Sequence, residues 1–179
     1  PMFSNKQYTG SVAVIREITE RKQMMEEIKL AEKKYRDIFE NAATGIFQTS
    51  PMGKLLTANQ ALADILGYQS PGEMIRTVND IKKSLYVSPW KRDEFRQLIE
   101  RNGAARGFEV KWRRKDGSEV FVSINAHAVR DENYATLYYE GILQDISERK
   151  RLEEFKIAKE AAEEANIAKS EFLSNMSHE

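Results

Sequence analysis

The stretch Ile142-Leu-Gln-Asp-Ile-Ser-Glu-Arg-Lys150 decides how the chain is divided, because a similar stretch occurs earlier. Its counterpart, Val14-Ile-Arg-Glu-Ile-Thr-Glu-Arg-Lys22, lies 128 residues before it (142 minus 14). In both copies a short β-branched run meets an acidic residue and Ile, and then Ser147 or Thr19 is suited to cap the start of a helix. Two copies at the spacing of a domain predict that one unit ends near residue 18 and another near residue 146.

This repeat predicts four parts. Residues 1–18 would be the last strand of a preceding unit, residues 19–40 a linking helix, residues 41–146 a complete domain, and residues 147–179 a coiled-coil linker. The opening Pro1-Met2 leads us to expect a fragment of a longer protein. A chance similarity between two charged helix starts is the alternative.

The composition restricts the classes of partner. Lys and Arg together number 28, as do Asp and Glu, so no net positive charge attracts nucleic acid, and we expect no nucleic-acid partner. No apolar run approaches the ~20 residues that a membrane span needs. We therefore expect no membrane contact in this segment and a cytoplasmic location, with an anchor elsewhere in the parent protein left open. The chain has no Cys, which excludes disulfides and thiolate metal sites.

Turn and helix signals predict two strands, several short helices and three more strands. Ser50-Pro-Met-Gly53 has the residues of a turn, and Asn59 and Gly67 are suited to begin and end a short helix. Apolar and polar residues alternate on both sides of Asp116-Gly117, as in a hairpin. The predicted fold class is α+β, with a single five-stranded antiparallel sheet, short helices on one face, and a flanking helix at each end.

Several of these segments resemble the PAS domain family. Asp145-Ile-Ser-Glu-Arg-Lys150 is similar to the end of a PAS domain and the start of the helix that follows it. Gly45-Ile-Phe-Gln-Thr-Ser50 and Lys54-Leu-Leu-Thr-Ala-Asn59 resemble its first hairpin, and Arg113-Arg-Lys-Asp-Gly-Ser-Glu-Val120 resembles a later one. The resemblance implies a sensory module whose sheet and helices enclose a small space.

The side chains expected around that space are apolar, and they allow two interpretations. They would line a pocket for an unidentified small molecule, or they would form a filled core: Leu62, Ile65, Leu66, Leu98, Phe108, Val110, Val122, Ile124 and Leu143. The aromatic residues Trp112, Tyr138 and Tyr139 would stack on a ligand or serve as ordinary sheet residues.

We expect no resident cofactor. Relatives that form a flavin adduct use a Cys, which this chain lacks, and haem-binding relatives use a His on the helix before the last three strands. Residues 89–101, where that helix is predicted, contain no His. No cluster of carboxylates indicates a metal site.

The end of the chain resembles a second family feature. Phe172-Leu-Ser-Asn-Met-Ser-His178-Glu179 is similar to the phosphoacceptor box of sensor histidine kinases. The resemblance implies that His178 accepts a phosphoryl group from ATP and that Glu179 is its general base or orienting residue. The sequence has no Gly-rich nucleotide loop, so ATP would be used only by a kinase domain of the parent protein, and a response regulator would receive the phosphoryl group. A helix that happens to end in His-Glu is the alternative.

Both flanking helices contain apolar stripes with spacings of three and four, as in a two-stranded coiled coil. The first stripe is Met24, Ile28, Ala31, Tyr35 and Ile38, and the second is Phe155, Ala158, Ala162, Ala165, Lys169, Phe172 and Met176. They predict a homodimer formed through the helices. Packing of each stripe on the chain's own sheet is the alternative.

The joint between the domain and the last helix also contains a candidate contact. Asp145 and Arg149 are four residues apart, and we expect them to pair and to couple the sheet to the helix. The favoured function is a sensory or relay module of a two-component sensor histidine kinase. The alternative is a stand-alone PAS module that binds a ligand or dimerises and has a different output.

Overall fold

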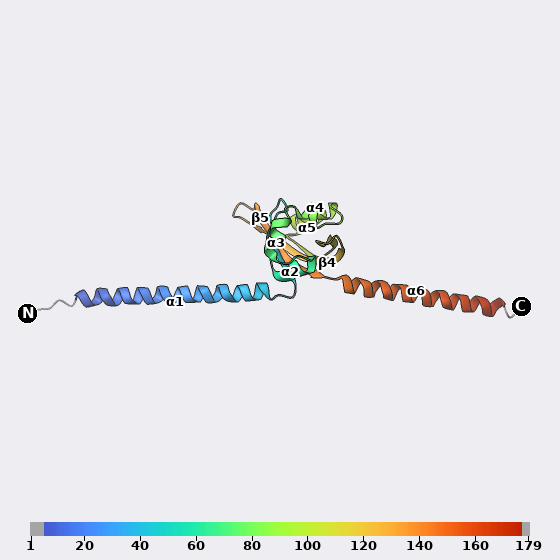
Figure 1. The fold of residues 1–179 in the computed structure, drawn as a ribbon, viewed down its shortest axis with the longest axis horizontal. Helices are drawn as coiled ribbons and strands as arrows, with labels where there is room; N and C mark the ends of the chain where they lie inside the picture. The colour runs from blue at the N-terminus through green and yellow to red at the C-terminus, as the bar shows by residue number, and fades with distance from the viewer. Residues whose placement is uncertain (1–5, 177–179) are drawn as a thin grey trace, which may run out of the picture. The chain divides into compact units, whose positions relative to one another are not determined.

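The computed structural model describes the backbone of residues 6–176. The chain divides into two units, residues 1–42 and residues 43–179, and each is considered by itself. Helix α1 (Lys6–Glu40) makes up the first unit, and the second contains the sheet, four short helices and the long helix α6 (Ser147–Met176) (Figure 1).

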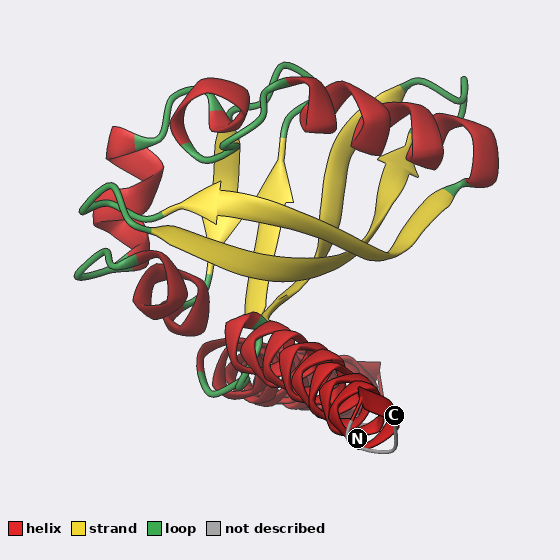
Figure 2. Cartoon of the chain, turned by 90° about the vertical axis from the view of Figure 1, so that its right-hand side faces the viewer, coloured by secondary structure: helices red, strands yellow, loops and turns green. Residues whose placement is uncertain are grey.

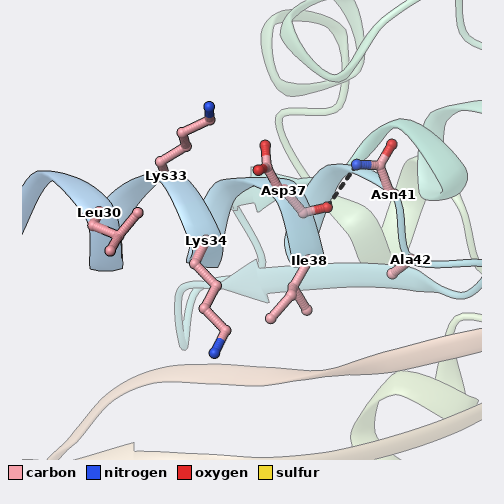
Figure 3. A pocket seen from close by; sticks show the side chains of 7 residues that line it. All are labelled: Leu30, Lys33, Lys34, Asp37, Ile38, Asn41 and Ala42. Atoms are coloured by element: carbon pink, nitrogen blue, oxygen red, sulfur yellow. Dashed lines mark hydrogen bonds between the residues drawn. The ribbon is translucent and has the colours of Figure 1, made fainter.

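Helix α1 ends at a side-chain cap. The amide of Asn41 donates to the backbone carbonyl of Asp37 over 2.8 Å, and the backbone N–H of Asn41 donates to the same carbonyl over 3.1 Å (Figure 3). These bonds occupy a carbonyl that has no partner within the last turn of the helix. Large apolar side chains of α1, among them Ile28 and Tyr35, are exposed.

The prediction of a strand in residues 1–18 is wrong for residues 6–18, which belong to α1. None of the strands in the described part of the chain pairs with this segment. A strand without a neighbour leaves its backbone N–H and C=O groups unpaired, whereas a helix pairs them within the segment itself. The strand-like composition of residues 12–18 is therefore not sufficient to form a strand here.

The second unit is built on one antiparallel sheet (Figure 2), and this confirms the predicted α+β fold class. The strands lie in the order β2-β1-β5-β4-β3. The first and last strands in sequence are therefore neighbours, so the end of the domain lies beside its beginning. The strands are β1 (Gly45–Thr49), β2 (Leu55–Ala58), β3 (Ala104–Arg113), β4 (Glu119–Arg130) and β5 (Thr136–Asp145).

Four short helices connect β2 to β3 and are grouped on one side of the curved sheet (Figure 2). They are α2 (Gln60–Leu66), α3 (Pro71–Thr77), α4 (Ile81–Ser84) and α5 (Trp90–Asn102). Asn59 begins α2, because its side chain accepts a hydrogen bond from the N–H of Leu62, and Gly67 ends it with a φ of 76°. Ser70 caps α3 in the same way as Asn59 caps α2. The bounds of α2 and the start of α3 are thus set by capping residues that can be found in the sequence.

The hydrophobic core lies between these helices and the inner face of the sheet. Along β3, the buried residues Phe108, Val110 and Trp112 alternate with exposed ones, as expected for a strand with one face covered. On α5, Phe95 and Ile99 are buried against them. The rings of Phe95 and Phe108 meet edge to face, with their centroids 5.4 Å apart.

Candidate functional site

The joint between β5 and α6 begins with Asp145, whose carboxylate has two partners. One oxygen accepts a hydrogen bond from the N–H of Ser147 over 2.8 Å, and the other pairs with the Arg114 guanidinium at 3.1 Å. Arg114 also donates from Nε to the carbonyl of Ile65 in α2, over 2.9 Å. Asp145 therefore caps the start of α6 and, through Arg114, connects it to the end of α2.

Strand β4 holds the other side of this joint. The N–H of Ile146 donates to the carbonyl of Phe121 over 2.9 Å, and the N–H of Phe121 donates to the Ser147 hydroxyl oxygen over 3.1 Å. Ile146 is buried. The prediction that Ser147 caps α6 is wrong, because its hydroxyl accepts a hydrogen bond from β4, and Asp145 provides the cap. The joint is thus bound to β4 by one bond between backbone groups and by one bond to the Ser147 side chain.

Glu109 on β3 forms a third connection. Its carboxylate pairs with Arg149 at 2.5 Å and with Lys150 at 2.7 Å. Hydrogen bonds from Lys150 and from Arg149 hold the pKa of Glu109 below its ordinary value, and the bond to Glu109 raises the pKa of each basic partner. Two adjacent residues of α6 therefore share one carboxylate of the sheet, which fixes the rotation of the first turn more narrowly than a single pair would.

The predicted pair of Asp145 and Arg149 is wrong in its partners. Among the described residues, Asp145 pairs with Arg114, and Arg149 pairs with Glu109. The cap at Ser147 occupies one oxygen of Asp145, and Arg149 lies over β3. Both residues thus belong to the joint, but each connects α6 to a different part of the domain.

Glu109 and Arg114 are not indicated by the sequence motif at the joint, because both are distant from it in the chain. Arg114 is 31 residues from Asp145, and Glu109 is 40 residues from Arg149. The available signal was the alternation of β3, which places Glu109 on the polar face between Phe108 and Val110. The pattern identifies the face, but it does not identify which basic residue covers it.

The residues expected around an interior space belong to the hydrophobic core or pack against it. Two of them, Ile65 and Leu98, are partly buried and pack against it, and the others are buried: Leu62, Leu66, Phe108, Val110, Val122, Ile124 and Leu143. Their contact with a ligand stays a prediction. Within residues 6–176, no cluster of His, Asp or Glu is arranged to hold a metal ion. Within the same residues, no helix has both the length and the apolar character of a membrane span.

The remaining predicted residues lie in α6 or after residue 176, where the described residues end. His178 and Glu179 are outside the described residues, so their role stays a prediction. Of the second apolar stripe, Phe155 is 70% exposed. Leu152, Ile157 and Ile167 are other large apolar residues of α6 that are exposed. These side chains give the described part of α6 an exposed apolar surface.

A family model described as "PAS domain" matches residues 43–148. The chain belongs to the PAS domain family. The match ends within the first turn of α6, so it includes the β5–α6 joint as far as Glu148.

The chain is also similar to a protein of known class. It is 34% identical over 89 residues to hybrid signal transduction histidine kinase A of Dictyostelium discoideum. The similar segment is 48% of this chain but 4% of that relative, so the chain corresponds to one small part of it.

Solved structures show the same fold. A PAS domain of a protein from Colwellia psychrerythraea has a TM-score of 0.56 and 22% identity, covering 66% of this chain and 98% of that one. A PAS domain from a two-component sensor histidine kinase has a TM-score of 0.53 and 15% identity, covering 65% of this chain and 97% of that one.

Proposed function

We propose that this chain is the sensory and relay part of a two-component sensor histidine kinase. A cue received by the PAS domain, or passed on by a preceding unit, would change the geometry of α6. In the full protein, His178 would accept the phosphoryl group of ATP and pass it to an aspartate of a response regulator. The similarity to a segment of a hybrid signal transduction histidine kinase supports this class.

The observation that carries the proposal is the way the first turn of α6 is attached. Glu109 on β3 binds both Arg149 and Lys150, and β4 binds the backbone at Ile146. A shift between β3 and β4 would therefore rotate or displace the start of α6. The helix continues to Met176 without interruption, and its 30 residues correspond to about 45 Å at ~1.5 Å per residue. A continuous helix of this length transmits a rotation applied at its first turn.

The test uses the longer natural protein that contains this chain, labelled with radioactive ATP. We expect His178→Gln to abolish an acid-labile label, since the imidazole is the proposed acceptor. We expect Glu109→Gln to change the labelling rate severalfold while leaving the acceptor intact. Labelling that survives His178→Gln would refute the role of His178.

A matched control separates the joint from general surface charge. Glu119 on β4 pairs with Lys111 on β3 at 3.1 Å, so Glu119→Gln removes an ion pair between two strands without removing one from α6. We expect it to leave the labelling rate unchanged. If Glu119→Gln and Glu109→Gln alter the rate equally, the β3–α6 contact is not the coupling point.

We also propose that α6 pairs with α6 of a second copy. Leu152 and Phe155 are exposed and lie three residues apart on one face of α6, and an apolar stripe with this spacing supports a helical dimer. Sedimentation of the chain should show a dimer that Phe155→Lys converts to monomer. A wild-type chain that stays monomeric at high concentration would exclude pairing by this segment alone.

A further inference from the structure

The loop between β4 and β5 contains a residue in an unusual backbone conformation. Tyr134 has a φ of 61°, and among the described residues it is the only one other than glycine with a positive φ. The Cβ atom makes this left-handed region unfavourable, and a bulky residue is rarely found there. Glycine would adopt the same φ without strain, so a tyrosine at this position costs stability and calls for an explanation.

The loop is held by Asp131 and not by the side chain of Tyr134. The Asp131 carboxylate accepts hydrogen bonds from the N–H groups of Asn133 over 2.9 Å and of Ala135 over 2.8 Å. The backbone carbonyl of Asp131 accepts a further bond from the N–H of Tyr134 over 3.0 Å. Tyr134 is 81% exposed, and its side chain has no hydrogen bond or ring contact within residues 6–176. The loop therefore fixes the direction of an aromatic side chain that the fold does not use.

The charge of this loop indicates what kind of surface it fits. Residues 131–135, which we call the Tyr134 loop, include the acidic residues Asp131 and Glu132 and no basic one. The loop lies at one end of the domain, beside the start of β5 (Figure 1). Tyrosine is among the residues that most often anchor a protein interface. A surface that receives the Tyr134 loop would therefore combine an apolar recess with positive charge at its border.

The same chain has a surface of this kind beside β3. It is a groove of about 330 Å³, which we call the lysine groove. Its lining combines apolar side chains with three lysines and one carboxylate, and includes Val87, Phe121, Lys91, Lys111, Lys150 and Glu109. The Nζ atom of Lys111 lies 4.8 Å from the ring centre of Phe121, so apolar surface and positive charge are in contact.

The lysines of the groove are paired within the chain, but only through surface pairs. Lys91 pairs with Glu94 at 2.8 Å, and Lys111 pairs with Glu119 at 3.1 Å. Both glutamates are exposed to solvent, with more than a third of each side chain accessible. Because exposed pairs of this kind contribute little free energy, a lysine that turns to an incoming carboxylate loses little. The groove can therefore receive an aromatic ring that has a carboxylate beside it.

The loop and the groove of one chain cannot meet, because they lie toward opposite ends of β4. Phe121 lines the groove, and Arg130 adjoins the loop nine residues later (130 minus 121), which is about 30 Å at ~3.4 Å per residue. We therefore propose that the Tyr134 loop of one copy inserts into the lysine groove of a second copy. The two surfaces differ, so each contact leaves one loop and one groove free, and further copies can add in a row. Because Glu109 and Lys150 line the groove, the contact would also reach the β5–α6 joint, and this consequence alone rests on the proposed function.

The first test measures association of this chain without any kinase domain, so its failure is separate from failure of the proposed function. The reference chain contains Phe155→Lys, which removes the proposed pairing through α6. In sedimentation at up to about 1 mM, we expect its average mass to rise with concentration. Tyr134→Gly should weaken this association about tenfold or more and leave Tm unchanged or higher, because glycine relieves the strain. Leu56→Ser, which removes an exposed apolar side chain from β2, should leave the association unchanged.

The second test locates the contact, and it is possible because the chain has no Cys. A chain with Asn133→Cys in the loop is mixed with a chain with Ser88→Cys in the groove, and oxidised glutathione is added. We expect a disulfide between the two chains. Arg101→Cys, at the exposed end of α5 far from Lys91, should not form one with Asn133→Cys.

Three results would overturn the proposal. The reference chain could stay monomeric at every concentration, or Tyr134→Gly could associate as the reference does. Alternatively, Arg101→Cys could form the disulfide as readily as Ser88→Cys. A clear fall in Tm for Tyr134→Gly would also overturn it, because the tyrosine side chain would then serve the fold and not a second copy.

Discussion

Two helical arginines of this domain have opposite surroundings. Arg149 lies at the surface at the start of α6 and is paired with Glu109. Arg92 lies on the buried face of α5 and has aromatic neighbours. Water and a carboxylate both stabilise the first charge, but neither stabilises the second. A surface charge that is neutralised by an ion pair is suited to hold a helix in position. A buried charge without a counter-charge is a cost to the fold.

Both arginines are on helices that pack against or begin at the same sheet. A substitution that disrupts the sheet should therefore have the largest effect on the free energy of unfolding. Gly141 lies in β5 between β1 and β4, and an added Cβ would lie 2.3 Å from the Asn125 carbonyl oxygen. Because backbone atoms cannot move aside as a flexible side chain does, we expect Gly141→Ala to lower the free energy of unfolding by about 3 kcal/mol or more. Urea denaturation of the wild-type chain and of the Gly141→Ala variant measures this difference in the free energy of unfolding.

The control for this substitution is another glycine with free space. At Gly72 in α3, the nearest atom to an added Cβ is the flexible Arg76 Nη1 at 3.6 Å. We expect Gly72→Ala to leave stability unchanged or to raise it by up to about 1 kcal/mol, since Ala favours the helix. If Gly141→Ala and Gly72→Ala change the free energy of unfolding equally, the close approach of the Asn125 carbonyl oxygen to Gly141 does not limit which residue fits in β5.

The contact between α2 and β1 should have the next largest effect. The side chain of Asn59 accepts hydrogen bonds from Ile46 N–H at 2.8 Å and Leu62 N–H at 3.0 Å, and it donates to the Thr44 carbonyl at 3.0 Å. Because Asn59→Ala leaves these groups without their partner in a buried place, we expect a loss of about 2–3 kcal/mol in unfolding experiments. Ser70→Ala, which removes a single half-buried cap bond, should cost about 1 kcal/mol.

The two arginines themselves can be compared directly. We expect Arg92→Met to raise the free energy of unfolding by about 1–3 kcal/mol, because a methionine fits an apolar site at no cost of desolvated charge. Arg149→Met should leave the urea midpoint close to that of the wild type, because water solvates this group. If Arg92→Met destabilises the domain more than Arg149→Met does, the cation–π contacts of Arg92 outweigh its desolvation, and the contrast between the two sites disappears.

Local signals predicted much of the fold. The ends of α2 at Asn59 and Gly67 could be predicted because a cap depends on residues only a few positions away. Alternation identified the inner faces of β3 and β4 for the same reason. The strand expected within residues 1–18 failed because a strand depends on a distant partner, which the described chain does not provide.

The candidate sites were predictable only in part. The sequence motif located the β5–α6 joint, but the partners Glu109 and Arg114 come from other strands and loops, and nothing nearby in the sequence indicates them. The burial of Arg92 was missed because a charged residue is expected on the solvent side of a helix. The available signal was its spacing of three residues from Phe95 and seven from Ile99, which places it on their face of α5. The charge of an arginine, however, predicts a position facing solvent.

The smallest effect concerns the pH dependence of the surface pair. The folded-state pKa of Glu109 lies below its ordinary value of 4.5, so its pairing stabilises the domain above the unfolded-state pKa and is lost as pH falls through the folded-state value. The difference in unfolding free energy between wild type and Glu109→Gln should therefore be present near neutral pH and decrease toward zero as pH falls through the lowered folded-state pKa of Glu109. Because Glu109 is largely exposed, we expect at most ~1 kcal/mol, and less at high salt. If this difference grows on acidification, Lys150 and Arg149 do not stabilise the Glu109 carboxylate. Arg149 would then not be a neutralised surface charge, in contrast to what is stated for it above.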